Sequence, residues 1–203
     1  MTRVFLVRHG ATDSLGRAIV GRKPGVALNG EGRAQAQGLG RRFRNEGITA
    51  IYCSPLDRAR ETAQPIADQL GLDIEIAPAL NEVDFGEWTG LSLEELAHRP
   101  DWQRWNSFRS SSRVPSGETM LEVQARVVGY IEKLGVAVRD AAYILVGHAD
   151  PIKSALLYFL GAAIDFMHRL EISPGSISAV ELGEQQPRLL YQRDSRELSR
   201  PGA

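Results

Sequence analysis

The stretches VFLVRHG (Val4–Gly10) and YILVGHA (Tyr143–Ala149) decide the fold of this chain. Each is an unbroken apolar run, rich in β-branched and aromatic residues, that ends in glycine and polar residues. Unbroken apolarity, rather than alternation, is typical of a strand that helices cover on both faces. A third run, from Ile48 to Cys53, ends at Ser54-Pro55. We therefore expect three buried strands.

Helical patterns follow these runs. One helix is expected over Glu31–Asn45, with Asn29 as its N-cap. A second is expected over Pro55–Leu70, because Ser54 is a good N-cap residue and proline suits the first helical position. The segments Ser92–Glu95 and Thr119–Glu122 both fit the capping-box pattern, and the second opens a long amphipathic stretch.

The C-terminal part adds strands to this pattern. Strand candidates are Arg169–Ile172, Ile177–Leu182 and Leu189–Gln192. Strands alternating with helices predict an α/β three-layer sandwich with a mostly parallel central sheet. We expect one domain over residues 1–203, with a helical insertion or lid at about 87–116 and a frayed tail at about 195–203.

Composition excludes several classes of protein. The chain has 203 residues, of which 43% are hydrophobic and 24% charged, as in ordinary globular domains. Cys53 is the only cysteine, which excludes an intrachain disulfide and a thiolate zinc site and indicates a small buried hydrophobe. The net charge of -1 gives no reason to expect nucleic acid or membranes as partners. No apolar run approaches the roughly 18 residues of a spanning helix, so a cytoplasmic location is expected.

Charged and imidazole side chains follow the predicted strands. Arg8 and His9 end the first strand, His148 ends another, and Arg58 and Arg60 open the helix after a third. In an open α/β sheet, ligands bind at the carboxyl ends of the strands, beside helix N-termini. Arginine pairs the oxygens of a phosphate group in bidentate fashion. A histidine at one strand end is more often structural, but several such ends together favour a phosphate site. The other two histidines, His98 and His168, have no such context and are expected to be structural.

Five segments in order resemble the motifs of the histidine phosphatase superfamily, the phosphoglycerate mutase-like enzymes. These are Leu6–Thr12 with its Arg-His-Gly signature, Ser54–Ala63, Leu80–Gly90, Pro115–Thr119 and Val146–Ala149. Arg-His-Gly alone is a weak signal, whereas five ordered motifs spanning nearly the whole chain are a strong one.

The resemblance implies a role for each matching residue. His9 would be the nucleophile that becomes phosphohistidine, and Glu82 would protonate the leaving oxygen. Arg8, Arg58 and His148 would hold the phosphoryl oxygens. Thr12 and Gly21 would line the substrate site, Gly21 through its backbone N–H. The substrate would be a small phosphorylated metabolite, and neither metal nor other cofactor would be needed.

These roles make physical demands on two of the residues. A neutral imidazole is a nucleophile in one tautomer only, so the other nitrogen of His9 must donate a fixed hydrogen bond, and a backbone carbonyl is the expected acceptor. Glu82 must carry a proton near neutral pH. Burial near Phe85 and Trp88 would raise its pKa, while nearby arginines would lower it. Asp84 and Glu87 are rival carboxylates in the same segment.

The chain departs from the family pattern at three places. Ala11 stands where many members have glutamate, and Leu15 where many have an asparagine that helps to hold phosphate. Thr12 or Ser14 could replace that contact in part. Gly147-His148-Ala149 stands in place of Ser-His-Gly. These departures affect substrate preference rather than an obligatory role.

Four functions remain open at this point. A phosphomonoester hydrolase is favoured over a cofactor-dependent phosphoglycerate mutase, because Trp105–Val114 offers Arg109 and Arg113 but no adjacent pair for a substrate carboxylate. A non-catalytic phosphate-binding module would be expected to lack His9 or Glu82. A metal-dependent hydrolase would need closer ligand spacing. The natural substrate and the oligomeric state do not follow from the sequence.

Overall fold

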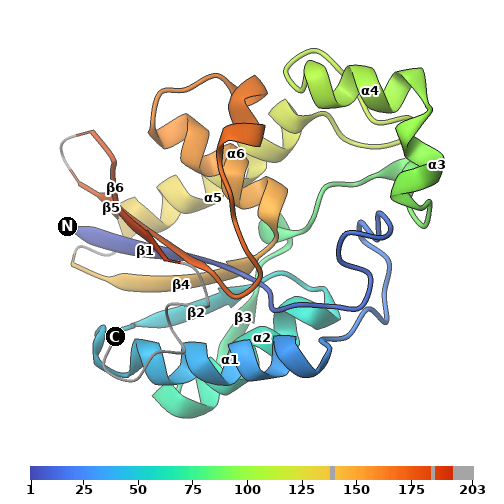
Figure 1. The fold of residues 1–203 in the computed structure, drawn as a ribbon. Coiled ribbons are helices and arrows are strands. Elements are labelled where there is room, and N and C mark those ends of the chain that lie inside the picture. The colour runs from blue at the N-terminus through green and yellow to red at the C-terminus, as the bar shows by residue number, and fades with distance from the viewer. Residues whose placement is uncertain (138–139, 184–185, 194–203) are drawn as a thin grey trace.

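A six-stranded sheet forms the centre of the computed structural model, which describes residues 1–137, 140–183 and 186–193 (Figure 1). The strands are β1 (Thr2–Arg8), β2 (Ala50–Cys53), β3 (Ile74–Ile76), β4 (Ala142–Gly147), β5 (Ile177–Leu182) and β6 (Arg188–Arg193). Their order is β3-β2-β4-β1-β5-β6. The pairings among β3, β2, β4 and β1 are parallel, and those of β5 with β1 and β6 are antiparallel.

Helices cover both faces of this sheet. On one face lie α1 (Gly30–Arg42) and α2 (Asp57–Leu70), and on the other lie α5 (Met120–Ala137) and α6 (Ala149–Phe159) (Figure 1). In β1, Val4 and Leu6 pack into the core beneath α5 and α6, whereas Phe5 and Val7 pack into the core beneath α1 and α2. Because both faces are buried, the strand reads as an unbroken apolar run. The predicted α/β class with a mostly parallel sheet is confirmed.

The segment between β3 and α5 carries two short helices, α3 (Leu93–Ala97) and α4 (Pro100–Ser107), beside the carboxyl ends of the strands (Figure 1). Its apolar side chains form a core together with residues of α5, α6 and the turn after α6, in which Trp88 and Trp105 are fully buried with ring centroids 5.5 Å apart. Short 3-10 helices lie at Phe43–Asn45, Pro78–Leu80, Gly86–Trp88 and Ile164–Arg169. Both α3 and α4 lie within the range of about 87–116 where a helical insertion or lid was expected.

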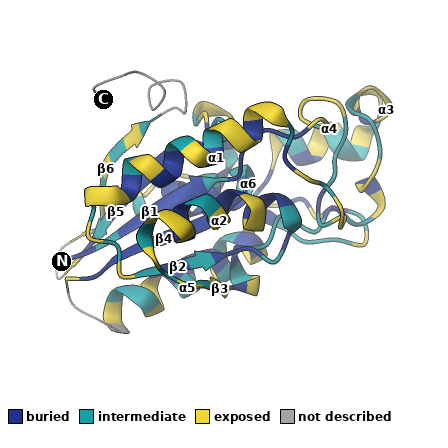
Figure 2. Cartoon of the chain, turned by 90° about the horizontal axis from the view of Figure 1, so that it is seen from below, coloured by how far each residue is buried: buried dark blue, intermediate teal, exposed yellow. Residues whose placement is uncertain are grey.

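The local signals are mostly confirmed. The Asn29 side chain accepts a hydrogen bond from Gly32 N at the start of α1, and the 3-10 turn Phe43–Asn45 completes the expected length. Both capping boxes form, at Ser92 and at Thr119. Buried helix faces point to the sheet, and exposed faces point outward (Figure 2). Cys53 is buried, and burial raises the pKa of its thiol to about 12.

Two expectations are wrong. Ser54 is not the N-cap of α2, because Pro55 and Leu56 remain outside the helix, which begins at Asp57. Arg169–Ile172 is not a strand. Both sides of β5 are already paired, by β1 and β6, and the carbonyl oxygen of Ile172 accepts a hydrogen bond from Arg8 Nη1 instead.

The predicted frayed tail from about residue 195 lies outside the described residues. Within the described ranges, none of the helices has the length and apolarity needed to cross a membrane.

Candidate active site

A cavity of about 210 Å³ lies at the carboxyl ends of the parallel strands. Two backbone hydrogen bonds bring the strand ends together: His9 N–H donates to Gly147 O, and Ser54 N–H donates to Val146 O, both at 2.9 Å. Gly10 is required beside them, because a Cβ there would lie 2.6 Å from the carbonyl oxygen of Gly32. The two predicted histidines therefore lie side by side, with ring centroids 5.1 Å apart.

His9 is held in one tautomer. Its Nδ1 lies 2.7 Å from Gly10 O, and since a carbonyl oxygen only accepts, Nδ1 carries the proton. This is the backbone acceptor that was expected. Burial, followed by the charges of Arg58 and Arg8, lowers the pKa of His9 to about 3. The imidazole is therefore neutral at physiological pH, with a lone pair on Nε2.

Arg58 and Arg8 bring guanidinium groups to His9. Arg58 is 1% exposed, and its Nε–H donates to His9 Nε2 at 3.3 Å while Nη2 donates to Gly21 O at 2.8 Å. Arg8 Nη1 donates to Ile172 O. Within the described residues, the buried Arg58 Nη1 and Arg8 Nε have no hydrogen-bond partner. Two cations therefore keep donors free beside the nucleophile.

His148 is fully buried behind the cavity wall rather than among the side chains that line it. Its Nε2 lies 2.8 Å from Ser54 Oγ, and its buried Nδ1 has no hydrogen-bond partner in the described part of the chain. Burial and the nearby charges of His9, Arg58 and Arg8 lower the pKa of His148 well below its usual value. This ring is therefore neutral too.

Glu82 closes the group from the segment before the lid. Its Oε2 lies 3.9 Å from His148 Nδ1, and Val83 N–H donates to its Oε1 at 2.9 Å. Arg22 and Arg126 both donate to its backbone carbonyl, which fixes the loop. Burial, and then the charge of Asp150, raise the pKa of Glu82 to about 7 against the opposing charge of Arg58.

The rival carboxylates lie elsewhere. Asp84 is an ion-pair partner of Arg22 at 3.6 Å, and Glu87 accepts a hydrogen bond from Ser116. Neither side chain lines the cavity. Of the carboxylates in this segment, only Glu82 lies beside the two histidines.

The remaining predicted residues line the cavity wall. Thr12, Ser14 and Leu15 contribute from the loop after β1, and Leu15 leaves 47% of its surface exposed. Gly21 has a φ of +47°, and a Cβ there would lie 3.2 Å from Thr89 Oγ1, so glycine suits the position. The contact observed for Gly21 is its carbonyl, which holds Arg58, rather than the expected N–H toward substrate.

Sequence reasoning missed three residues of this site. Ser54 contacts His148, and Thr62 accepts from Gly10 N–H while donating to Arg58 O. Asp150 lines the cavity from the first turn of α6. The available signals were spacing alone: Thr62 follows Arg58 by one helical turn, and Asp150 follows His148 by two residues.

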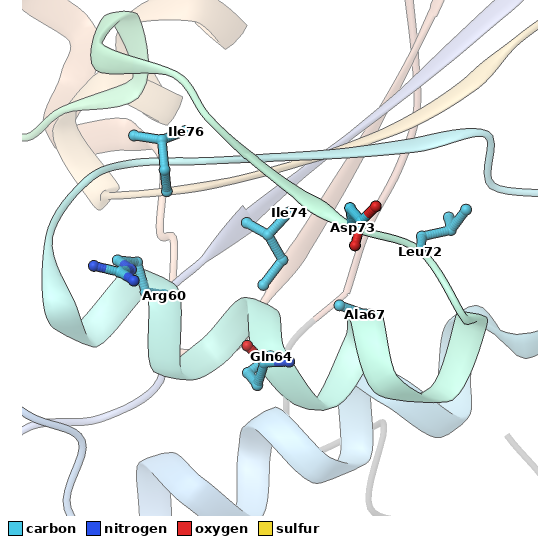
Figure 3. A pocket seen from close by; sticks show the side chains of 7 residues that line it. All are labelled: Arg60, Gln64, Ala67, Leu72, Asp73, Ile74 and Ile76. Carbon is cyan, nitrogen blue, oxygen red and sulfur yellow. The ribbon is translucent and has the colours of Figure 1, made fainter.

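A second hollow of about 300 Å³ lies between α2 and β3 (Figure 3). Arg60 and Gln64 line it from α2, and Ile74 and Ile76 line it from β3. Its charged side chains are Arg60 and Asp73, and its lining contains no histidine.

Among the described residues, no group of three or more His, Cys, Asp and Glu side chains is placed to hold a metal ion. The ionisable groups in and beside the first cavity are two imidazoles, two guanidiniums and the carboxyl groups of Glu82 and Asp150. This donor set suits a phosphoryl group, whose oxygens accept hydrogen bonds from guanidinium and imidazole N–H groups.

Comparisons with known proteins agree with this geometry. The family model of the histidine phosphatase superfamily (branch 1) matches residues 4–195. Bifunctional protein Rv2228c of Mycobacterium tuberculosis is 36% identical over 198 residues, which cover 94% of this chain and 54% of that protein. The chain thus spans about half the length of that relative. Probable phosphoglycerate mutase GpmB of Enterobacter sp. is 32% identical over 91% of this chain and 86% of its own length.

A solved structure shares the fold. Phosphoserine phosphatase from Entamoeba histolytica has a TM-score of 0.87 at 23% identity, covering 98% of this chain and 100% of the other. The predicted resemblance is confirmed by the family match over nearly the whole length: the chain belongs to the histidine phosphatase superfamily.

Proposed function

We propose that the chain is a phosphomonoester hydrolase that works through a phosphohistidine on His9. One observation carries the proposal. Arg58 donates to the acceptor nitrogen of His9, the ring of His148 lies 5.1 Å from that of His9, the charge of Arg8 acts on His9, and each of these three residues has a buried side-chain nitrogen without a hydrogen-bond partner within the described residues. A buried donor without a partner costs about 1–3 kcal/mol, so a ligand that supplies acceptors is favoured there. A phosphoryl group supplies them.

In the first step, His9 Nε2 attacks phosphorus and the bond between phosphorus and the ester oxygen breaks. Nδ1 keeps its proton throughout and donates it in a hydrogen bond to Gly10 O. The contact from Arg58 Nε to His9 Nε2 is long, at 3.3 Å, and the phosphoryl oxygens replace His9 as its acceptor. Charge builds on the equatorial oxygens in the transition state, where the arginines stabilise it without further reorganisation.

Glu82 moves the protons. With a pKa of about 7, it is partly protonated at neutral pH and gives its proton to the leaving oxygen. The resulting carboxylate then takes a proton from water, whose oxygen attacks phosphorus as the bond to His9 Nε2 breaks. Inorganic phosphate leaves, and His9 and Glu82 return to their starting states.

Phosphoglycerate mutase activity is the second candidate, supported by similarity to GpmB. Arg109 is buried and paired with Asp150, and Arg113 is paired with Glu122, so neither is free to hold a substrate carboxylate. The paired state of these two arginines favours the hydrolase.

The labelling experiment uses a phosphomonoester that carries radioactive phosphate. Wild-type protein quenched during turnover should carry an acid-labile, alkali-stable label, and His9→Ala should neither be labelled nor release phosphate above about one part in 10⁴ of the wild-type rate. Labelled phosphate elsewhere in the chain would contradict the proposal. Incubation with 3-phosphoglycerate and a trace of its bisphosphate separates the candidates, because isomerisation faster than phosphate release would favour the mutase.

A further inference from the structure

The cavity is lined by two chemically different sets of side chains. Arg8 and Arg58 are the only arginines that line it, and lysine is absent from its lining among the described residues. Both act on His9. Apart from the catalytic Glu82 and the polar Thr12 and Ser14, the rest of the lining consists of Asp150, glycines and apolar side chains. We call Asp150 and the largest of these apolar side chains, Leu15, Ile19, Phe85 and Leu93, the second wall. Whatever is attached to a phosphoryl group at His9 lies in the same cavity as the second wall.

Asp150 is held firmly in that wall. Its Oδ2 accepts a hydrogen bond from Arg109 Nη1 at 3.2 Å. Arg109 is 5% exposed, with its guanidinium carbon 3.3 Å from the ring centroid of Trp105, and its Nη2 donates to Asn106 at 2.9 Å. The lid therefore fixes the carboxylate from behind, while Arg109 itself does not line the cavity.

Arg109 does not cancel the charge that Asp150 presents to the cavity. Arg109 also interacts with the charge of Asp165, which is bound to Ser110, so one guanidinium faces two carboxylates. The charge of Asp150 also acts on two other residues that line the cavity, since it contributes to raising the pKa of Glu82 and opposes the lowering of the pKa of Arg8. The second wall is therefore both apolar and negative.

We propose, on the basis of the function proposed above, that Asp150 makes the cavity select phosphomonoesters whose alcohol portion is apolar and neutral or positively charged. A carboxylate on the alcohol portion meets the charge of Asp150 without a free arginine to compensate, whereas an ammonium group meets an opposite charge. At separations of a few ångströms in a partly hydrated cavity, one such contact changes kcat/KM by about tenfold in either direction.

Three phenyl phosphates that differ only in the para substituent test this selectivity: aminomethyl, hydroxymethyl and carboxyl. Wild-type kcat/KM should fall in that order, by about tenfold at each step. Asp150→Asn should reduce both steps to about twofold or less. Because Asp150→Asn also alters Glu82, the comparison uses ratios between substrates within one variant, in which a shared change in proton transfer cancels.

The matched control must remove a carboxylate that has no part in the pairing of Arg109. Asp165→Asn would itself let Arg109 neutralise Asp150, so the unchanged reference is Asp101→Asn. Asp101 lies in α4, pairs with Arg99 and does not line the cavity, so its removal should keep the substrate ratios within about twofold of wild type. Ratios that are flat in the wild type, or that persist in Asp150→Asn, would overturn the selectivity by Asp150. Turnover of the hydroxymethyl compound in either case would leave the proposed hydrolase standing.

Binding to His9→Ala, measured by calorimetry, separates the two proposals when turnover is absent. Affinity graded from aminomethyl to carboxyl, and lost in a second substitution of Asp150→Asn, supports the selectivity even if no phosphate is released by the wild type. Ungraded affinity together with no turnover overturns both proposals.

Discussion

Two hollows lie beside α2, and the smaller one, rather than the larger one, is the candidate active site. The larger, at about 300 Å³, is lined by the exposed Arg60 and by Ile76, which leaves 48% of its surface exposed. The smaller, at about 210 Å³, is lined by the buried Arg58 and His9. The candidate active site is therefore distinguished by buried polar groups that lack hydrogen-bond partners among the described residues, and not by its volume.

One helix supplies an arginine to each hollow. Positions 58 and 60 are about 200° apart around an α-helix, so their side chains leave α2 on opposite sides. Arg58 enters the space beside His9, where Gly21 O and His9 Nε2 accept its hydrogen bonds. Arg60 points to the hollow against β3 (Figure 3). Two arginines that are two residues apart therefore lie in different environments: Arg58 is buried and Arg60 is exposed.

Replacing each arginine by methionine tests the contrast most strongly. Arg58→Met removes a donor aimed at the phosphoryl oxygens, and kcat/KM for a phosphomonoester should fall by about a thousandfold. Arg60→Met, on the same helix, should change kcat/KM by less than about twofold. Steady-state phosphate release measures both.

Arg58→Lys is the control for a loss of activity that is caused by misfolding. Lysine keeps the charge but loses the fork, so its kcat/KM should lie between those of the wild type and Arg58→Met. Circular dichroism melts of all three variants show whether the fold persists. Comparable losses for Arg58→Met and Arg60→Met would remove the distinction between the two hollows.

Glu82→Gln tests whether Glu82 is the proton donor in the smaller hollow. Glutamine cannot deliver a proton, so turnover of an alkyl phosphate should fall by about a hundredfold. A nitrophenyl phosphate has a better leaving group, and its turnover should fall by less than about tenfold. Equal losses for both substrates, measured as kcat, would show that Glu82 supports the structure instead.

The pH dependence of the wild type follows from the same carboxyl. Because the proton donor must be protonated, alkyl phosphate turnover should fall as pH rises through about 7, and this limb should be absent in Glu82→Gln. The folded state binds more protons than the unfolded state between pH 4.5 and about 7. The stability of the wild type relative to Glu82→Gln should therefore fall as pH rises through that window, as urea unfolding can measure.

The strands that are buried on both faces could be predicted from the sequence, because such burial requires an unbroken apolar run. Unbroken apolar runs located β1, β2 and β4, and the polar residues at their ends gave Arg8, His9, Arg58 and His148. The three-residue edge strand β3 carries no such imprint, because two of its residues are exposed. Asp150 was missed because its partner Arg109 lies 41 residues away on the lid. Local patterns do not encode such a pairing.

Ser54 shows the same limit and gives the last prediction. Its hydroxyl was interpreted as a helix cap, yet it contacts His148, 94 residues away. Ser54 Oγ accepts from Leu56 N–H at 3.4 Å, and we expect its own proton to be donated to His148 Nε2, 2.8 Å away. That donation keeps the proton of His148 on Nδ1, the nitrogen nearest Glu82.

Ser54→Ala should therefore lower kcat/KM by about fivefold, the equivalent of about 1 kcal/mol for one hydrogen bond. Ser178→Ala, at a buried serine on β5 whose hydroxyl has no hydrogen-bond partner in the described ranges, should leave kcat/KM unchanged. If both variants kept full activity at unchanged stability, the tautomer of His148 would be set by other contacts.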